Sequence, residues 1–169
     1  MMNITEVVKD ENVLALLLDT TVNGITLSDP NKEDNPIVYA NAAFEKISGY
    51  SSEESIGKNC RFLQGKDKNQ ANVKKIQEAV AERRPIRTDI VNYRKDGELF
   101  YNEISTSPIY NKQGDLIYFL GIQHDVTEKV LAQKEIERIH KRLGGLYVGL
   151  GICVVLLLGM ATWALVIGS

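Results

Sequence analysis

The chain has 169 residues, enough for one domain of ordinary size and an appendage, but too few for two full domains and a linker. Charged residues make up 25% and the net charge is -2, and no basic patch with interleaved aromatic side chains is present, so nucleic-acid binding is not expected. All Asp, Glu, Lys and Arg residues lie at or before Arg142. The composition therefore divides the chain into a mixed-charge front part and an uncharged C-terminal end.

The front part begins with helical spacing and then changes to strands. Apolar residues recur at near-helical intervals over residues 4–18, which predicts an amphipathic helix within an N-terminal segment, residues 1–19. Residues 24–29 (GITLSD) and 37–41 (IVYAN) are typical of short strands separated by a polar turn.

The main domain is expected to span residues 20–127. Residues 42–84 contain short helical stretches broken at glycines and then one longer helix, which Pro85 closes. After Pro85 apolar residues alternate with polar ones, and turns at 96–97 and 113–114 divide this region into three antiparallel strands. The pattern predicts an α+β domain with a five-stranded antiparallel sheet and helices over one face, and such a face can hold a small molecule.

Residues 128–143 return to helical spacing and are interpreted as a linker helix. Apolar side chains alternate at intervals of three and four, as in a coiled coil, at Ile136, Ile139, Leu143, Leu146 and Leu150. A homodimer formed through residues 128–150 is therefore expected, and a GxxxG pair at Gly145 and Gly149 favours close approach of two helices. The alternative is a single helix that docks this apolar stripe against the sheet.

The C-terminal end, residues 144–169, reads as a transmembrane helix. Residues 146–167 carry only apolar, Gly and Thr side chains, and as a helix they would span roughly 33 Å, the thickness of a bilayer core. The alternative is a buried core helix. Basic residues cluster just before the span, so the expected location is a cell membrane, crossed once, with the N-terminal domain cytoplasmic.

Cysteine usage points to one thiol in the front part. The chain has two cysteines, and Cys153 falls inside the expected span, so Cys60 is interpreted as a free thiol. On a short helix Cys60 and Gln64 would share a face.

Amide side chains recur on the three C-terminal strands, at Asn92, Asn102 and Gln123. The turn at 96–97 would place Asn92 and Asn102 nearly opposite each other. A cluster of amides on an apolar sheet face needs a partner with donors and acceptors, because each unpaired amide costs on the order of 1–3 kcal/mol. The alternative is that these residues face water.

Residues 20–128 resemble the flavin-binding light-oxygen-voltage domains, a branch of the PAS fold. The segments that carry the resemblance are GKNCRFLQG (57–65), DNPIVYAN (34–41), GYSSEE (49–54), NYRKDG (92–97), FYNEIS (100–105) and YFLGIQHDVTE (118–128). The resemblance implies a bound FMN. It also implies that blue light drives reversible addition of the Cys60 thiol to flavin carbon C4a.

The resemblance further implies roles for individual residues. Asn92, Asn102 and Gln123 would bind the pyrimidine edge of the flavin, and Phe119 would belong to the same cofactor site. Gln123 would also relay the signal, because adduct formation turns flavin N5 from a hydrogen-bond acceptor into a donor and the amide answers by rotating.

At the other end of the flavin, the resemblance implies that Asn59 and Gln64 meet the ribityl hydroxyls and that Arg61 holds the phosphate. The position of a second phosphate-binding arginine is Gln77 in this chain, and Lys74 lies one turn earlier. This departure predicts weaker FMN retention, or tolerance of FAD or riboflavin.

The sequence thus predicts a membrane-anchored blue-light photoreceptor that signals through its C-terminal helix to an unidentified membrane or cytoplasmic partner. It is not expected to be an enzyme, since neither His124 nor His140 has a catalytic partner at motif spacing. One alternative is a flavin- or ligand-binding PAS redox sensor that forms no adduct, in which Cys60 only fills space. Another is a passive tether or the sensor fragment of a larger membrane receptor.

Overall fold

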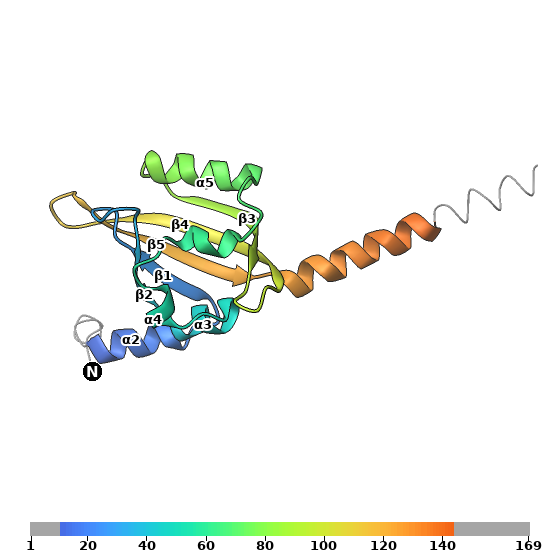
Figure 1. The fold of residues 1–169 in the computed structure, drawn as a ribbon, viewed down its shortest axis with the longest axis horizontal. Helices are drawn as coiled ribbons and strands as arrows, with labels where there is room; N and C mark the ends of the chain where they lie inside the picture. The colour runs from blue at the N-terminus through green and yellow to red at the C-terminus, as the bar shows by residue number, and fades with distance from the viewer. Residues whose placement is uncertain (1–10, 144–169) are drawn as a thin grey trace, which may run out of the picture. The chain divides into compact units, whose positions relative to one another are not determined.

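The computed structural model describes residues 11–143, and its centre is a five-stranded antiparallel sheet (Figure 1). The strands follow the order β2-β1-β5-β4-β3 across the sheet. Their bounds are β1 Gly24–Ser28, β2 Ile37–Ala40, β3 Ile86–Tyr93, β4 Leu99–Tyr110 and β5 Leu116–Asp125. The five strands and their antiparallel pairing confirm the fold class expected from the sequence.

The last strand in the sequence, β5, lies in the middle of the sheet. It pairs with β1 on one side and with β4 on the other, so that Gln123 lies between Gly24 and Ile104. Successive residues of β5 therefore form backbone hydrogen bonds alternately with β1 and with β4.

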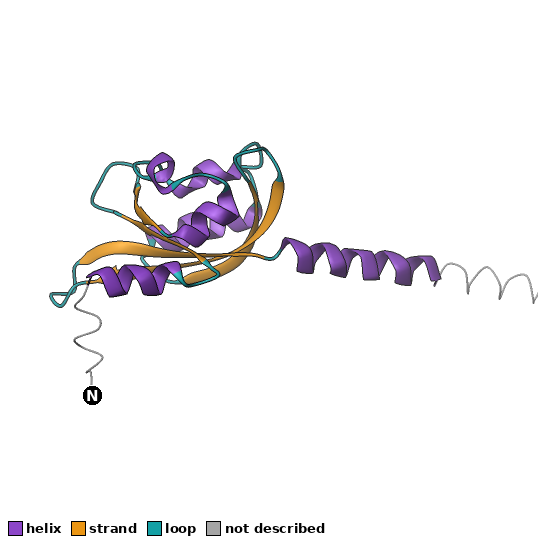
Figure 2. Cartoon of the chain, turned by 90° about the horizontal axis from the view of Figure 1, so that it is seen from below, coloured by secondary structure: helices purple, strands orange, loops and turns teal. Residues whose placement is uncertain are grey.

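Four helices gather over one face of the sheet (Figures 1 and 2). They are α3 Ala42–Ser48, α4 Ser52–Ser55, the 3₁₀ helix η1 Cys60–Gln64 and α5 Ala71–Ala81. Polar side chains begin them: Asn41 caps α3, and Ser51 with Glu54 forms a capping box on α4. These caps satisfy amide groups that a helix start leaves without partners.

The largest fully buried apolar side chains lie between the helices and the sheet. Ile37, Phe44 and Leu63 form one cluster with Ala40, and each of the three is at most 1% exposed. Burying such side chains contributes about 1.5–3 kcal/mol each. This cluster fixes α3 and η1 over strand β2.

The edge strand β3 is covered through polar side chains next to α5. Gln70 accepts from the Val91 amide and donates to the Val91 carbonyl, both at 2.7 Å, and Asn72 donates to the Asp89 carbonyl. These bonds occupy backbone groups that a sheet edge otherwise presents to other chains.

The N-terminal helix α2 spans Glu11–Asp19 and so overlaps the helix expected over residues 4–18. Asn41 holds its end, because its amide donates to the carbonyls of Leu18 and Asn23 while its oxygen accepts from Ile25 and Phe44. Residues 1–10 lie outside the described residues.

A polar cluster ties the end of β5 to the β3–β4 hairpin. Arg94 donates to Asp125 at 2.6 Å and its guanidinium lies 4.7 Å from the centre of the Phe100 ring. Asp125 in turn accepts from the backbone and hydroxyl of Thr127, whose hydroxyl accepts from the Tyr101 amide. These bonds fix Asp125 and Thr127 against the hairpin.

A helix covers residues 127–143 of the described chain, as the sequence predicts for 128–143. Its apolar side chains are exposed: Leu131, Ile136, Ile139 and Leu143 are between 46% and 55% accessible. The remaining positions of the predicted coiled-coil seam, Leu146 and Leu150, lie outside the described residues.

The predicted membrane location requires a correction. No helix within residues 11–143 is long and apolar enough to cross a membrane, and this finding contradicts the expected single-pass location in a cell membrane. The expected span itself, residues 146–167, lies outside the described residues.

Candidate functional site

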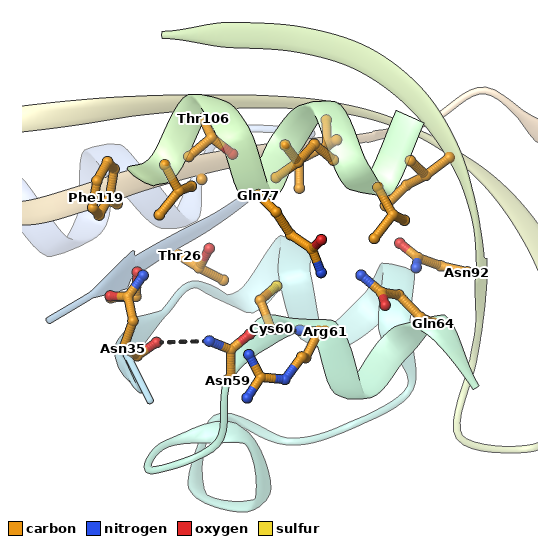
Figure 3. Close-up of a pocket in the computed structure, with 17 residues that line it drawn as sticks. Thr26, Asn35, Asn59, Cys60, Arg61, Gln64, Gln77, Asn92, Thr106 and Phe119 are labelled. Carbon is orange, nitrogen blue, oxygen red and sulfur yellow. Dashed lines mark hydrogen bonds between the residues drawn. The ribbon is translucent and has the colours of Figure 1, made fainter. Parts of the chain in front are cut away.

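A cavity lies between the sheet and the helices η1 and α5, and Cys60 stands in its wall (Figure 3). Strands β1, β3, β4 and β5 supply its other walls. Of the ten candidate residues from the sequence, seven line it: Asn59, Cys60, Arg61, Gln64, Gln77, Asn92 and Phe119. Asn102 and Gln123 lie buried behind Asn92 and Cys60, in contact with them.

Cys60 is the first residue of η1, which Asn59 begins by accepting from the Arg61 amide at 3.1 Å. The thiol packs against the apolar cluster of Ile37, Phe44 and Leu63. Burial raises the pKa of the Cys60 thiol to about 11, although a hydrogen bond from Gln123 acts in the opposite direction. The thiol is therefore neutral at physiological pH and a weak nucleophile in its ground state.

Three buried amides form a chain behind the thiol. Asn102 donates to Asn92 at 2.9 Å and to the Gln123 oxygen at 3.2 Å, and the Gln123 amide donates to the Cys60 sulfur at 3.5 Å. Each amide side chain is at most 2% exposed. The predicted amide cluster on one sheet face is thus present, and it reaches the cysteine directly.

The strand register differs slightly from the expected one. Asn92 pairs with Phe100, and Asn102 pairs with Ile90, so the two asparagines are diagonal neighbours rather than opposite each other. The hairpin is centred on Asp96, with the Arg94 amide donating to the Glu98 carbonyl. Because the shift is two residues, both side chains still point to the same face.

The two residues assigned to the ribityl chain differ in whether their side chains already form hydrogen bonds within the protein. The side chain of Asn59 already has hydrogen-bond partners within the protein. Its oxygen caps η1, and its amide donates to the carbonyls of Asp34 at 2.5 Å and Asn35 at 3.4 Å. The sequence argument placed Cys60 and Gln64 on one face by α-helical spacing. The segment η1 is instead a 3₁₀ helix, in which residues three apart share a face, and Gln64 nevertheless lines the cavity. Its side chain makes no hydrogen bond to any other described residue.

The three residues considered for the phosphate differ in whether they line the cavity and in whether they carry a charge. Arg61 lines the cavity, and its guanidinium forms an ion pair with Asp34. Gln77 extends from α5 into the cavity (Figure 3). Lys74 is exposed and lies outside the cavity lining.

Several lining residues were not identified from the sequence. Thr26 and Thr106 put hydroxyl groups into the wall, and Gly121 leaves room there, because a β-carbon at that residue would lie 2.6 Å from the Thr26 hydroxyl. The period-two pattern of β4 that placed Asn102 and Ile104 on one face also includes Thr106, so this residue was within reach of the sequence argument.

The polar atoms in the cavity wall and directly behind it suit the flavin that the resemblance implies. Among the described residues, the side-chain oxygens of Asn102 and Asn35 are buried without a hydrogen-bond partner. A buried acceptor of this kind is costly unless a ligand supplies a donor. The pyrimidine edge of a flavin offers an N–H between two carbonyls, which complements the Asn92 and Asn102 amides.

Comparisons with known proteins agree with this geometry. The PAS domain family matches residues 22–128. The chain is 44% identical over 125 residues to "Blue-light-activated histidine kinase 1" of Erythrobacter litoralis, covering 72% of this chain and 35% of that protein. It is 39% identical over 156 residues to "Blue-light photoreceptor" of Listeria monocytogenes, covering 89% of this chain and 61% of that protein.

A solved structure described as "Structure of an RNA-binding Light-Oxygen-Voltage Receptor" is similar with a TM-score of 0.70 and 36% identity, covering 77% of this chain and 36% of that one. The chain thus spans about a third of the length of the kinase relative and of the solved structure, and 61% of the photoreceptor.

Proposed function

Because the chain belongs to the PAS domain family and carries a light-oxygen-voltage photoreceptor domain, we propose that it senses blue light through bound FMN, with Cys60 as the reactive side chain. The observation that carries the proposal is the partly buried hydrogen bond from the Gln123 amide to the Cys60 sulfur, at 3.5 Å, in the wall of the cavity. Gln123 is a residue of the central strand β5, and its side-chain amide contacts the thiol directly.

The bound flavin would supply absorption of blue light and an excited carbon–nitrogen double bond. Cys60 would supply to that excited ring a sulfur for a reversible bond and a thiol proton, and both would return to the thiol in darkness, so no external oxidant or reductant would be consumed. The raised pKa of the thiol suits this chemistry, because a neutral, buried thiol does not react before light arrives.

Gln123 is proposed to report the change at N5. Its oxygen accepts from Asn102 and its amide donates to Cys60, so a flavin atom that presented a donor to this amide in place of an acceptor would favour its rotation. A rotated Gln123 would also change the partner of Asn102, which has an unpaired oxygen available. The alteration would then spread along β5.

The light signal is proposed to be transmitted by the helix of residues 127–143 to another copy of the chain or to a partner protein. No catalytic turnover in this segment is part of the proposal. Support comes from the exposed side chains of Ile136, Ile139 and Leu143, which follow the spacing of a coiled-coil seam. Exposed apolar side chains on one helix commonly mark a protein interaction surface.

Absorption spectroscopy of the full chain tests the proposal. Spectra would be recorded in darkness, after a blue flash and during recovery, for the native protein, for Cys60→Ala and for Cys153→Ala as the matched control. We expect reversible bleaching of the blue band in the native protein and in Cys153→Ala, and none in Cys60→Ala. Reversible bleaching in Cys60→Ala, or a chain that binds no flavin, would refute the adduct mechanism.

A further inference from the structure

The cavity carries very little charge for a site that would hold a phosphorylated ligand. Of the 17 described residues that line it, Arg61 alone carries a full charge at neutral pH. A phosphate on a bound flavin would therefore depend on this one guanidinium for charge-assisted hydrogen bonds.

That guanidinium already has a partner. Arg61 Nη2 is paired with Asp34 Oδ1, outside the cavity lining. The carboxylate is held in place from the backbone side, because the Asn59 amide donates to the Asp34 carbonyl at 2.5 Å. Asp34 also has a φ of 66°, a left-handed conformation that Asp and Asn tolerate better than most residues. The local chain thus fixes an acidic group beside the phosphate-binding arginine.

The pairing changes what a phosphate would encounter. Opposite charges in direct contact largely cancel at distances of a few ångströms, and a carboxylate near a phosphate repels it. The side chains of Arg61 and Asp34 are 55% and 50% exposed, so solvent screens both effects further. The net attraction of this pair for a phosphate is therefore small.

No other cation at this site compensates. Gln77 points into the cavity from α5 and is uncharged (Figure 3). Lys74, one turn away, is exposed and is not part of the described lining. The described cavity therefore has strong amide groups for a flavin ring and a nearly neutral environment for its tail.

We propose that Asp34 acts as a specificity-determining residue that cancels the phosphate-binding charge, so that this cavity binds riboflavin nearly as tightly as FMN. The inference rests on the proposed flavin site. Affinity then comes from the ring and the ribityl chain, through Asn92, Asn102 and Gln64, none of which distinguishes the two ligands. FMN is one ligand of this site, and the unphosphorylated flavin is the other.

Equilibrium dialysis of the flavin-free full chain against riboflavin and FMN tests this inference. In the native protein we expect the two dissociation constants to agree within about threefold, well below the tenfold ratio that 1.4 kcal/mol represents. In Asp34→Asn the freed guanidinium should tighten FMN binding on the order of tenfold and leave riboflavin unchanged. Asn suits the left-handed backbone, so this variant retains the local conformation.

Glu33→Gln is the matched control, because it removes an equal charge one residue away, and Glu33 forms no ion pair with another described residue. Its FMN affinity should equal that of the native chain. Gln77→Arg provides an independent gain of charge from α5 and should also tighten binding of FMN alone. Salt should weaken FMN binding more in Asp34→Asn than in the native chain.

The inference is overturned if native protein binds FMN more than about thirtyfold tighter than riboflavin, a gap near 2 kcal/mol, or if Asp34→Asn and Glu33→Gln bind FMN alike. The blue-flash experiment, repeated with each flavin, separates this result from the proposed function. Equal binding without bleaching refutes the photochemistry alone, bleaching with a large FMN preference refutes the role of Asp34 alone, and absence of binding by either flavin refutes both.

Discussion

Replacement of Cys60 by Ala should remove a pH dependence from the stability of the domain. Burial raises the pKa of this thiol from 9.0 to about 11, so between these values the folded protein keeps a proton that the unfolded chain has lost. Protonation linkage then favours unfolding as pH rises, because the folded state binds more protons. The contribution is fully present below pH 9 and is lost by pH 11, and each pH step of one corresponds to about 1.4 kcal/mol.

The expected loss for native protein relative to Cys60→Ala is therefore about 3 kcal/mol across this range. Urea denaturation followed by circular dichroism, in darkness at pH 8, 9, 10 and 11, measures the free energy of unfolding of both proteins. Tyr39 and Tyr93 also have raised pKa values, from burial and from the Asp67 hydrogen bond respectively, but they are present in both proteins and their effects cancel in the difference. A difference that stays constant from pH 8 to pH 11 would refute the burial of the thiol.

Three further substitutions test the packing around the site, each by urea denaturation. Arg94→Met should lower the free energy of unfolding by about 2 kcal/mol, because it leaves the partly buried Asp125 carboxylate without its cation, and no loss would contradict the cluster that ends β5. Gly121→Ala should lower it by about 1–3 kcal/mol, since the new β-carbon would lie 2.6 Å from the Thr26 hydroxyl, and adding Thr26→Ala should recover most of that loss. Tyr39→Phe should raise it by about 1 kcal/mol, because among the described residues the Tyr39 hydroxyl is buried without a partner, and a decrease would indicate that this hydroxyl is bonded.

The sheet was predictable because its signals are local. Period-two alternation and the turns at 96–97 and 113–114 divide this region into three strands, and the structure has β3, β4 and β5 there. The same alternation places Asn92 and Asn102 on one face whatever the small error in register. The local sequence pattern was therefore sufficient to predict both the fold class and the amide cluster.

Contacts between distant segments could not be predicted in this way. The pairing of Arg61 with Asp34 depends on a turn and a helix that adjoin only in the folded chain, and the commitment of Asn59 to the Asp34 carbonyl has the same origin. Asn41 appeared only as the end of a strand, yet it joins α2, β1 and α3. Such roles arise from tertiary geometry, and a single sequence gives no signal for them.

Three consecutive residues of β5 explain why a change at the cavity would reach beyond it. Gln123 faces the cavity side, His124 is exposed and contacts the Asn23 side chain at 2.8 Å before β1, and Asp125 binds Arg94 of the hairpin. Successive side chains of a strand point to opposite faces, so this short segment connects the thiol, the N-terminal region and the start of the residue 127–143 helix. Strand pairing holds Gln123 between β1 and β4, whereas His124 and Asp125 pair with β4. Under the proposed mechanism, a rotation of Gln123 would act on the N-terminal region through His124 and Asn23, and on the start of the residue 127–143 helix through Asp125.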